Sequence, residues 1–327
     1  MAAFRCACFD IGAGGPFRAA MAAQSVRVHI SAMPMNAAAE LNAAPSDRAG
    51  LMHLAGHVVL LTVTGLLIAW TRGSLLLPVA LVLHGIVLAF LFAPLHESVH
   101  RTAFRSRWLN DSVAAVAGFL LLLPPSWFRA FHFAHHRHTQ IAGLDPELEV
   151  KEVETWPDYL IHLSGWRNWK ASILLILRQA WGRADAAFVP PRLEPRLVRE
   201  ARIMLAAYLA IAALSLALRS NAALVYWVIP VLLGQPFLRA YLLAEHTGLP
   251  LVESFWENTR TTLTGYPLRF LAWNMPFHTE HHVNPGVPFY ALPELHRRER
   301  ENLKAVSPGY VAFHREWQQR LNAARRA

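Results

Sequence analysis

Histidine is the residue type whose spacing first suggests chemistry in this sequence. The chain has 17 histidines among 327 residues, and nine of them fall in three compact clusters. The clusters are His96-Glu-Ser-Val-His100, then His132-Phe-Ala-His135-His136 with His138 two residues further on, and His278-Thr-Glu-His281-His282. On a helix, residues three and four apart share one face. Each cluster is therefore predicted to present its imidazoles together on one side of a helix.

A metal site is the chemistry that this pattern favours. Neutral imidazoles buried side by side leave donors and acceptors unpaired, whereas metal ligation uses their lone pairs. One zinc ion takes about four ligands, so eight clustered histidines indicate two metal ions. Imidazole suits iron, zinc and copper, and an iron pair is able to activate oxygen for chemistry on unactivated C–H bonds. We therefore predict a non-haem site for two iron ions.

Two other classes of protein share parts of this pattern. The run His96-Glu97-Ser-Val-His100 matches the signature of zinc metalloproteases, in which the glutamate is the general base. An intramembrane metalloprotease would need one further ligand and would leave the two HxxHH clusters unexplained. A metal sensor or transporter is also open, although a transporter places polar ligands at mid-bilayer rather than at helix ends.

The elements that must position these clusters are apolar helices. Hydrophobic residues make up 54% of the chain and charged residues only 16%, a balance typical of membrane proteins. Four apolar stretches predict membrane-spanning helices, at about 51–70, 75–95, 203–218 and 222–244. Only a few residues separate the first stretch from the second and the third from the fourth. The sequence therefore predicts an all-α integral membrane protein with four spanning helices in two hairpins.

Two further segments are predicted to lie at the membrane surface. Residues 113–125 form an apolar run too short to cross a bilayer, and it ends in a Pro-Pro pair, which favours a re-entrant or interfacial segment. Residues 156–181 mix Trp, Tyr and Arg with Leu and Ile. That mixture is typical of an amphipathic helix lying on the bilayer surface.

The distribution of basic residues predicts the orientation. Thirteen Lys or Arg lie in 96–201 and ten lie from Glu245 onward, against one in each hairpin loop. The positive-inside rule then places both long segments, and both termini, in the cytoplasm. All three histidine clusters fall on this side and form a histidine-rich cap. The net charge of +9 does not indicate nucleic-acid binding, because the basic residues follow the apolar segments instead of forming one patch with aromatic side chains.

The chain is predicted to hold one membrane domain between two shorter segments. Residues 1–45 contain no apolar run of signal-peptide length, so we expect a disordered segment or a start assigned too early, with weak transit-like character as the alternative. Cys6 and Cys8 both lie there, so no disulfide staples the body. Residues 46–300 are the predicted membrane domain, and residues 301–327 a basic cytoplasmic tail.

The three clusters, their order and the two hairpins resemble the membrane fatty acid desaturase family over about residues 50–300. The strongest local match runs from Asn258-Thr-Arg260 through Trp273-Asn274-Met-Pro-Phe277 and the HTEHH cluster to 287–293. The resemblance implies two irons, O2 as co-substrate and one additional histidine after the fourth span, matched here by His246. The implied ligands are His96, His100, His132, His135, His136, His246, His278, His281 and His282.

Some positions depart from the family or support the ligands from outside. Some members carry an asparagine one turn before the additional histidine, where this chain has Leu242. Glu97 lies about 100° off the face of its flanking histidines, so we expect it to orient a ligating imidazole. We place His138, Asp145 and Glu280 in the same supporting set, and for His138 a role as an alternative ligand is also open. For Asp145 a solvated acidic turn is the equally open interpretation.

The resemblance implies desaturation of a long-chain acyl lipid. Such an apolar substrate would enter from the bilayer, since the spans enclose the route to the metals. A membrane di-iron hydroxylase, or a carotenoid ketolase or hydroxylase, is the alternative within the same class. The sequence has no His-Pro-Gly-Gly haem motif, so we expect electrons from a separate ferredoxin or cytochrome-type donor. An acidic donor would suit the basic cytoplasmic face.

Overall fold

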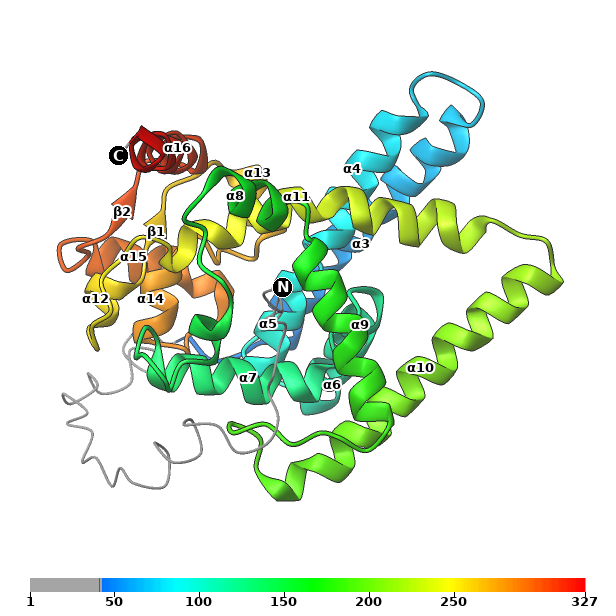
Figure 1. The fold of residues 1–327 in the computed structure, drawn as a ribbon, viewed down its shortest axis with the longest axis horizontal. Coiled ribbons are helices and arrows are strands. Elements are labelled where there is room, and N and C mark those ends of the chain that lie inside the picture. Colours follow the sequence, from blue (N-terminus) through cyan, green and yellow to red (C-terminus); the bar gives the residue numbers. More distant parts are fainter. Residues whose placement is uncertain (1–40, 42, 327) are drawn as a thin grey trace, which may run out of the picture.

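The computed structural model describes residues 41 and 43–326, and its elements are helices apart from one two-residue strand pair in this part of the chain (Figure 1). The predicted N-terminal segment 1–45 lies almost wholly outside the described residues, and its character stays a prediction. The longer helices, in chain order, are α3 (Asp47–Thr71), α4 (Leu77–Ala89), α5 (Phe92–His100), α6 (Arg107–Leu120), α7 (Pro125–His138), α8 (Trp156–Leu163), α9 (Trp166–Ala180), α10 (Glu194–Ala217), α11 (Ile229–His246), α15 (Leu292–Glu299) and α16 (Tyr310–Arg326). Shorter elements are η1 (Pro146–Glu149), η2 (Pro191–Leu193), η3 (Leu224–Val228), α12 (Phe255–Asn258), β1 (Thr261–Thr262), α13 (Tyr266–Leu271), α14 (His278–Val283), η4 (Phe289–Ala291) and β2 (Val306–Ser307).

Four helical segments of the described chain are long and apolar enough to cross a membrane, which confirms the predicted spans. They are α3, α4 with α5, η2 with α10, and η3 with α11. Only 11% of the most apolar window of α3 and of α10 is buried, against 56% for α4–α5 and 44% for η3–α11. The first helix of each hairpin therefore faces lipid, and the second helix faces protein.

The third span begins earlier than the predicted 203–218. Its helix starts at Pro191 and reaches Ala217. The first turns carry Arg196, Arg199 and Glu200, so hydropathy alone does not reveal them. Proline in the first turn and good helix formers after it extend the helix into the polar region.

Helices α6 and α7 meet at a break of four residues and are bent by 100°. The predicted re-entrant segment 113–125 covers the end of α6 and this break. His100 just before α6 and His132 on α7 lie 2.8 Å apart, Nε2 to Nε2. His100 before the pair and His132 in its second helix therefore lie side by side, as the predicted re-entrant segment requires.

The predicted surface helix 156–181 is two helices, α8 and α9. Gly165 has a φ of 70° and separates them, a conformation that glycine adopts without steric cost. The side chains of Trp166 and Trp181, at the two ends of α9, are 65% and 77% exposed. Exposed tryptophans at both ends suit a helix at a membrane interface.

The two hairpins meet where α4 crosses α11, at a pair of glycines. A Cβ atom added to Gly85 would lie 2.1 Å from the carbonyl oxygen of Pro230, and one added to Gly234 would lie 1.9 Å from that of Gly85. Only glycine permits backbones to approach this closely. Because α5 continues α4, this crossing joins the helical segment that carries His96 and His100 to the helix that ends at His246.

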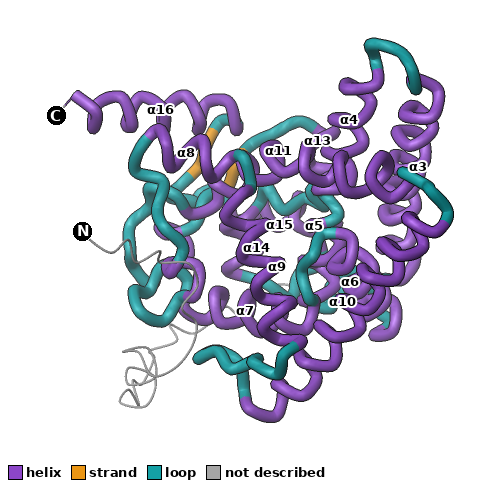
Figure 2. The backbone as a smooth tube through the Cα atoms, turned by 45° about the vertical axis from the view of Figure 1, so that its right-hand side comes forward, coloured by secondary structure: helices purple, strands orange, loops and turns teal. Residues whose placement is uncertain are grey.

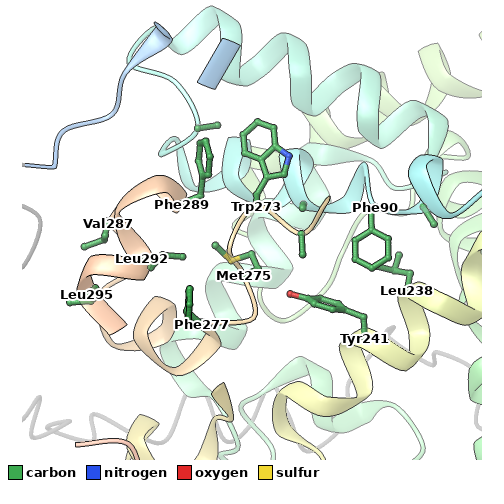
Figure 3. Packing of buried hydrophobic residues seen from close by; sticks show 14 of the residues in the cluster. Phe90, Leu238, Tyr241, Trp273, Met275, Phe277, Val287, Phe289, Leu292 and Leu295 are labelled. Atoms are coloured by element: carbon green, nitrogen blue, oxygen red, sulfur yellow. The ribbon is translucent and has the colours of Figure 1, made fainter. Parts of the chain in front are cut away.

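A hydrophobic cluster includes Met275 and Phe277, which directly precede the third histidine cluster in the chain (Figure 3). Trp273 and Phe289 are fully buried, with ring centroids 4.5 Å apart. Phe90 of α4 and Tyr241 of α11 meet in the same cluster, 5.4 Å apart. The segment before α14 is thereby packed against both hairpins.

The C-terminal segment folds back onto the cap. Strands β1 and β2 pair in parallel, and α16 lies along α8 and α11 (Figure 2). Phe313 and Leu321 of α16 are buried in this contact. The domain boundary at residue 300 stays a prediction, but the segment 301–326 is packed against the membrane domain.

Candidate metal centre

The nine predicted histidines converge from four helices, α5, α7, α11 and α14, into two neighbouring groups. The ligand atoms of each group lie within 4.8 Å of one another. The first group is His96, His100, His132, His136 and His281, and the second contains His135, His246 and His282. The Nε2 of His278 joins the second group, at 3.2 Å from the Nε2 of His246 and 3.1 Å from that of His282. The structure brings all nine together, and their role as ligands is a proposal.

Both HxxHH clusters divide between the two groups. On α7, His132 and His136 point to the first group while His135 points to the second. On α14, His281 belongs to the first group and its neighbours to the second. The parallel rings of His136 and His282, 4.1 Å apart between centroids, join the two groups. Each helix therefore helps to set the spacing of both sites.

The nitrogen atoms of the first group fit a metal better than they fit one another. Among the described residues, both ring nitrogens of His96 and of His281 are buried without a hydrogen-bond partner. Leaving a buried polar group unpaired costs about 1–3 kcal/mol, which metal ligation would remove. Five imidazoles within reach of one point are a donor set that suits iron, zinc or copper.

The second group has lone pairs aimed at one place. The Nδ1 of His246 donates a hydrogen bond to the backbone oxygen of Asn258 at 3.0 Å. Its Nε2 therefore carries a lone pair and faces the Nε2 of His278, which in turn faces the Nε2 of His282. A cation between these nitrogens satisfies the arrangement, so the second group also fits a metal.

Asp145 contacts the ring of His135, and its role in orienting that ring stays a prediction. Both carboxylate oxygens lie close to the Nδ1 of His135, at 3.0 and 3.1 Å. The backbone N–H groups of Gln140 and Glu147 donate to the same carboxylate. Burial alone would raise the pKa of Asp145, but these hydrogen bonds hold it below its usual value. Burial alone would lower the pKa of His135, yet Glu147 and Asp145 together raise it above its usual value.

Glu97 approaches a ligand but bonds elsewhere. It is completely buried, and its Oε1 lies 3.7 Å from the Nδ1 of His96. Its Oε2 accepts hydrogen bonds from the hydroxyl of Thr102 and the backbone N–H of Phe289. Glu97 therefore ties α5 to the hydrophobic cluster beneath the cap. A carboxylate engaged in this way is not placed as the general base of a metalloprotease, and the metalloprotease alternative loses its main support.

The other two predicted supporting residues do not touch a ligand in the described chain. Glu280 is buried and accepts hydrogen bonds from Thr261 and from His296, each at 2.5 Å. It fastens α14 to β1 and α15, which places the third cluster indirectly. His138 is the last residue of α7, is half-buried, and lies outside both groups.

Three supporting contacts escaped sequence reasoning. Thr139 Oγ1 lies 3.2 Å from the Nδ1 of His282, and Glu245 Oε1 lies 3.6 Å from the Nδ1 of His278. The third is the backbone oxygen of Asn258 that accepts from His246. Asn258 lies in the stretch that resembles the family, so the sequence offered a signal for it. Thr139 contacts a residue 143 positions away, and no local pattern in the sequence indicates that contact.

An apolar cavity leads to both groups. Its volume is about 740 Å³, and five of the nine histidines line it: His96, His132, His135, His246 and His278. Phe92, Phe128, Leu238 and Leu242 form part of its apolar wall. Lys151 lies at a polar end of the cavity and is paired with Asp158 at 2.7 Å. A long apolar molecule bound in this cavity would pass beside the histidines that line it.

Comparison with known proteins decides the family. The family model for fatty acid desaturases matches residues 72–314 of this chain. The chain belongs to the fatty acid desaturase family. This membership confirms the predicted family, the enzyme class of oxidoreductase and the membrane location.

Three similar proteins carry desaturase names. An sn-1 oleoyl-lipid 12-desaturase from Picosynechococcus sp. is 26% identical over 255 residues, covering 72% of each chain. A dihydrorhizobitoxine desaturase from Bradyrhizobium elkanii is 24% identical over 292 residues, covering 84% of this chain and 80% of the relative. A sphingolipid delta(4)-desaturase/C4-monooxygenase from Homo sapiens is 27% identical over 212 residues, covering 61% and 58%. This desaturase is thus distant from each relative.

Proposed function

We propose that this desaturase introduces a double bond into the acyl chain of a membrane lipid, with two bound iron ions, O2 and electrons from a separate protein. The observation that carries the proposal is the apolar cavity of about 740 Å³ that touches histidines of both groups. The lipid substrate is supported by the names of the cyanobacterial relatives, which are oleoyl-lipid desaturases.

The nine histidines are the proposed ligands. One iron would be held by the five imidazoles of the first group and the other by the four imidazoles of the second. An iron pair so held supplies the activation of O2 that removal of hydrogen from a saturated carbon requires. Leu242 lines the cavity beside the second group, so this chain offers no side-chain ligand at that position.

The protein's own part is to bind and orient the acyl chain and to exclude water. The ring of Phe128 stacks on His132 with centroids 5.2 Å apart, and Phe92 lies beside His96. These rings and Leu238 provide apolar contacts for methylene groups beside the proposed iron ligands. A buried apolar wall also keeps water from competing for the reactive centre.

The reaction balances with an external reductant. Two hydrogen atoms leave adjacent carbons, and O2 is reduced to two water molecules with two electrons and two protons from outside the substrate. We place both termini and the histidine-rich cap in the cytoplasm, on the support of the positive-inside rule. The basic face there suits an acidic ferredoxin or a cytochrome-type donor.

Hydroxylation of the same substrate class is the second candidate. The human relative carries both desaturase and monooxygenase in its name. The two outcomes differ in whether a second hydrogen atom leaves the substrate or an oxygen atom enters it. The position of the acyl carbons in the cavity decides between them.

The deciding experiment compares the acyl chains of a host that makes the wild-type protein with those of a host that makes His281→Ala. Gas chromatography with mass detection is expected to show a new unsaturated chain with the wild type alone. Metal analysis of the purified wild type is expected to show two irons per chain. A hydroxylated product would select the second candidate, and a purified protein that binds no iron would refute the proposal.

A further inference from the structure

A second cavity of about 440 Å³ adjoins α7, and none of the nine clustered histidines proposed as ligands lines it. Its walls come from α6, α7, the end of α5 and the start of α10. Five arginines line it: Arg101, Arg129, Arg137, Arg192 and Arg196. Asp111 and Glu200 are its two acidic residues, so the lining carries a net charge of +3. The proposed iron chemistry uses none of these side chains.

Among the described residues the arginines of this cavity form no close ion pair, although the charge of Asp111 acts on Arg129 and that of Arg196 on Glu200. Within residues 43–326, none of the five forms an ion pair with an acidic side chain at 4.0 Å or less. Glu200 instead accepts a hydrogen bond from the backbone N–H of Ser126 at 3.0 Å. At the larger cavity Lys151 and Arg167 both pair with Asp158, while Arg239 forms no ion pair among the described residues. The positive charge of the smaller cavity is therefore only partly neutralised within the described chain, which leaves room for an external anion.

Arg129 is the arginine of this cavity whose guanidinium most clearly lacks a hydrogen-bond partner. Its Nη1 atom is buried and has no hydrogen-bond partner among the described residues. Its guanidinium lies over the ring of Phe133, 4.3 Å from the centroid, which fixes its direction. Burial, followed by the charge of Arg101, lowers the pKa of Arg129 to about 10. Burying a charged donor without a partner is costly, and a bound anion would remove that cost.

The location of the cavity favours the headgroup of a lipid. Arg192 and Arg196 lie at the start of the third span, and Phe188 and Leu193 add apolar wall. Guanidinium groups match the oxygens of phosphate in pairs. Basic pockets between spanning helices on the cytoplasmic side bind lipid headgroups. We propose that this cavity binds the phosphate group of an anionic membrane phospholipid.

Occupancy of this site would brace α7. Arg129 and Arg137 stand on the same helix as His132, His135 and His136, and they line a cavity that none of these imidazoles lines. A lipid phosphate joined to both arginines and to the start of α10 would hold that helix from outside. The proposal rests on the membrane placement of α10 and does not depend on the acyl chemistry proposed above.

Binding of lipid to the full-length protein, purified in detergent with its iron, tests the proposal. Phosphatidylglycerol, phosphatidylcholine and inorganic phosphate are titrated separately, with thermal unfolding and native mass spectrometry as the readouts. We expect phosphatidylglycerol to raise the unfolding temperature and to be retained on the protein. Affinity is expected to fall about tenfold in Arg129→Gln and in Arg196→Gln, the size expected for losing one charge-assisted hydrogen bond.

Controls separate this site from general charge effects and from misfolding. Arg298→Gln removes one positive charge from an exposed helix, where Arg298 pairs with Glu294, and should leave lipid affinity unchanged. Arg196 is exposed, so Arg196→Gln tests the site even if Arg129→Gln fails to fold. Equal effects of the two lipids, or equal losses in all three variants, would overturn the proposal. A response to inorganic phosphate that matches the lipid would overturn the lipid source and assign the site to soluble phosphate.

Discussion

The two histidine groups differ in whether oxygen atoms of the protein contact their ring nitrogens. In the second group, oxygen atoms of Asp145, Asn258 and Thr139 contact the Nδ1 atoms of three rings, and Glu245 lies 3.6 Å from the fourth. In the first group, no ring nitrogen makes a hydrogen bond to an oxygen atom of the described chain, and the rings contact mainly one another. The protein therefore orients the second group, while the first group relies on its own packing.

This difference predicts unequal metal binding. Partners that fix the tautomer and direction of a ligating imidazole raise metal affinity, and a preorganised site binds more tightly. We therefore expect iron to bind first and more tightly at the second group. The first group would gain its final geometry as the second ion binds.

Removing a ligand is the strongest way to test the comparison. We expect His281→Ala, in the first group, to lower turnover by roughly tens to a thousandfold, since even outer partners cost about 10- to 100-fold. It should keep the iron of the second group, whereas His282→Ala should lose both. Iron analysis of the two purified variants beside the wild type measures this. Retention of two irons by His281→Ala would contradict its role as a ligand.

Replacing the best-placed carboxylate should weaken one group alone. Asp145→Asn removes the charge that orients His135, and we expect iron affinity of the second group to fall about 10- to 100-fold. Competition with a chelator measures the affinity of each site. Glu97→Gln is the matched control, because Glu97 bonds to Thr102 and Phe289 rather than to an imidazole. Equal losses in both variants would show that the carboxylates act through the fold.

Acid should lower the folding stability of the metal-free protein. The contact of Asp145 with His135 should make this loss of stability smaller. Burial, with the charge of neighbouring imidazoles, holds the pKa values of His278, His281 and His282 well below 6.5. The unfolded chain then binds more protons, so stability falls as the pH drops below about 6.5. The pKa of His135 is raised, so its contribution is present below pH 6.5 and is lost as the pH rises through its folded pKa.

The unfolding temperature of metal-free protein between pH 8 and pH 5 tests this. In Asp145→Asn the loss of stability on acidification should be steeper than in the wild type, because His135 no longer gains from its carboxylate partner. An unchanged slope would mean that Asp145 does not stabilise protonated His135. Iron-loaded protein should resist the same acidification to a lower pH, since ligation opposes protonation.

The smallest effect is expected at His138. It lies outside both groups and is half-buried at the end of α7. Substitution by alanine should change stability by less than about 0.5 kcal/mol, as at other sites without a specific role. Turnover and iron content should stay within about twofold of the wild type. A loss comparable to that of Asp145→Asn would place His138 in the second group's support.

Local sequence patterns predicted most of the residues of the site. The features that were not predicted depend on contacts between residues far apart in the chain. The spacing of histidines identified His96, His132 and His278 together with their helical neighbours, because a helix fixes which residues share a face. It did not reveal that each HxxHH cluster serves both groups, since that depends on how four helices cross. The contact of Thr139 with His282 likewise joins segments 143 residues apart.

The fold shows the same division. Hydropathy located the four spans, which are long apolar runs. It missed the polar first turns of α10, where helix propensity and packing extend the helix beyond the apolar region. Hydropathy also missed the break between α8 and α9 at Gly165. A single glycine within an amphipathic pattern does not by itself indicate the end of a helix.

The glycine crossing of α4 and α11 bears on how the protein is made. Each hairpin has its own pair of apolar helices and can insert in the bilayer by itself, before any contact between the hairpins forms. The first hairpin delivers His96 and His100, and His246 arrives only with the second. Docking at Gly85 and Gly234 is thus the assembly step that joins two half-sites. With the nine histidines as the proposed ligands, a nascent chain arrested before this step would hold an incomplete set, and the proposed oxygen chemistry would wait until synthesis is nearly complete.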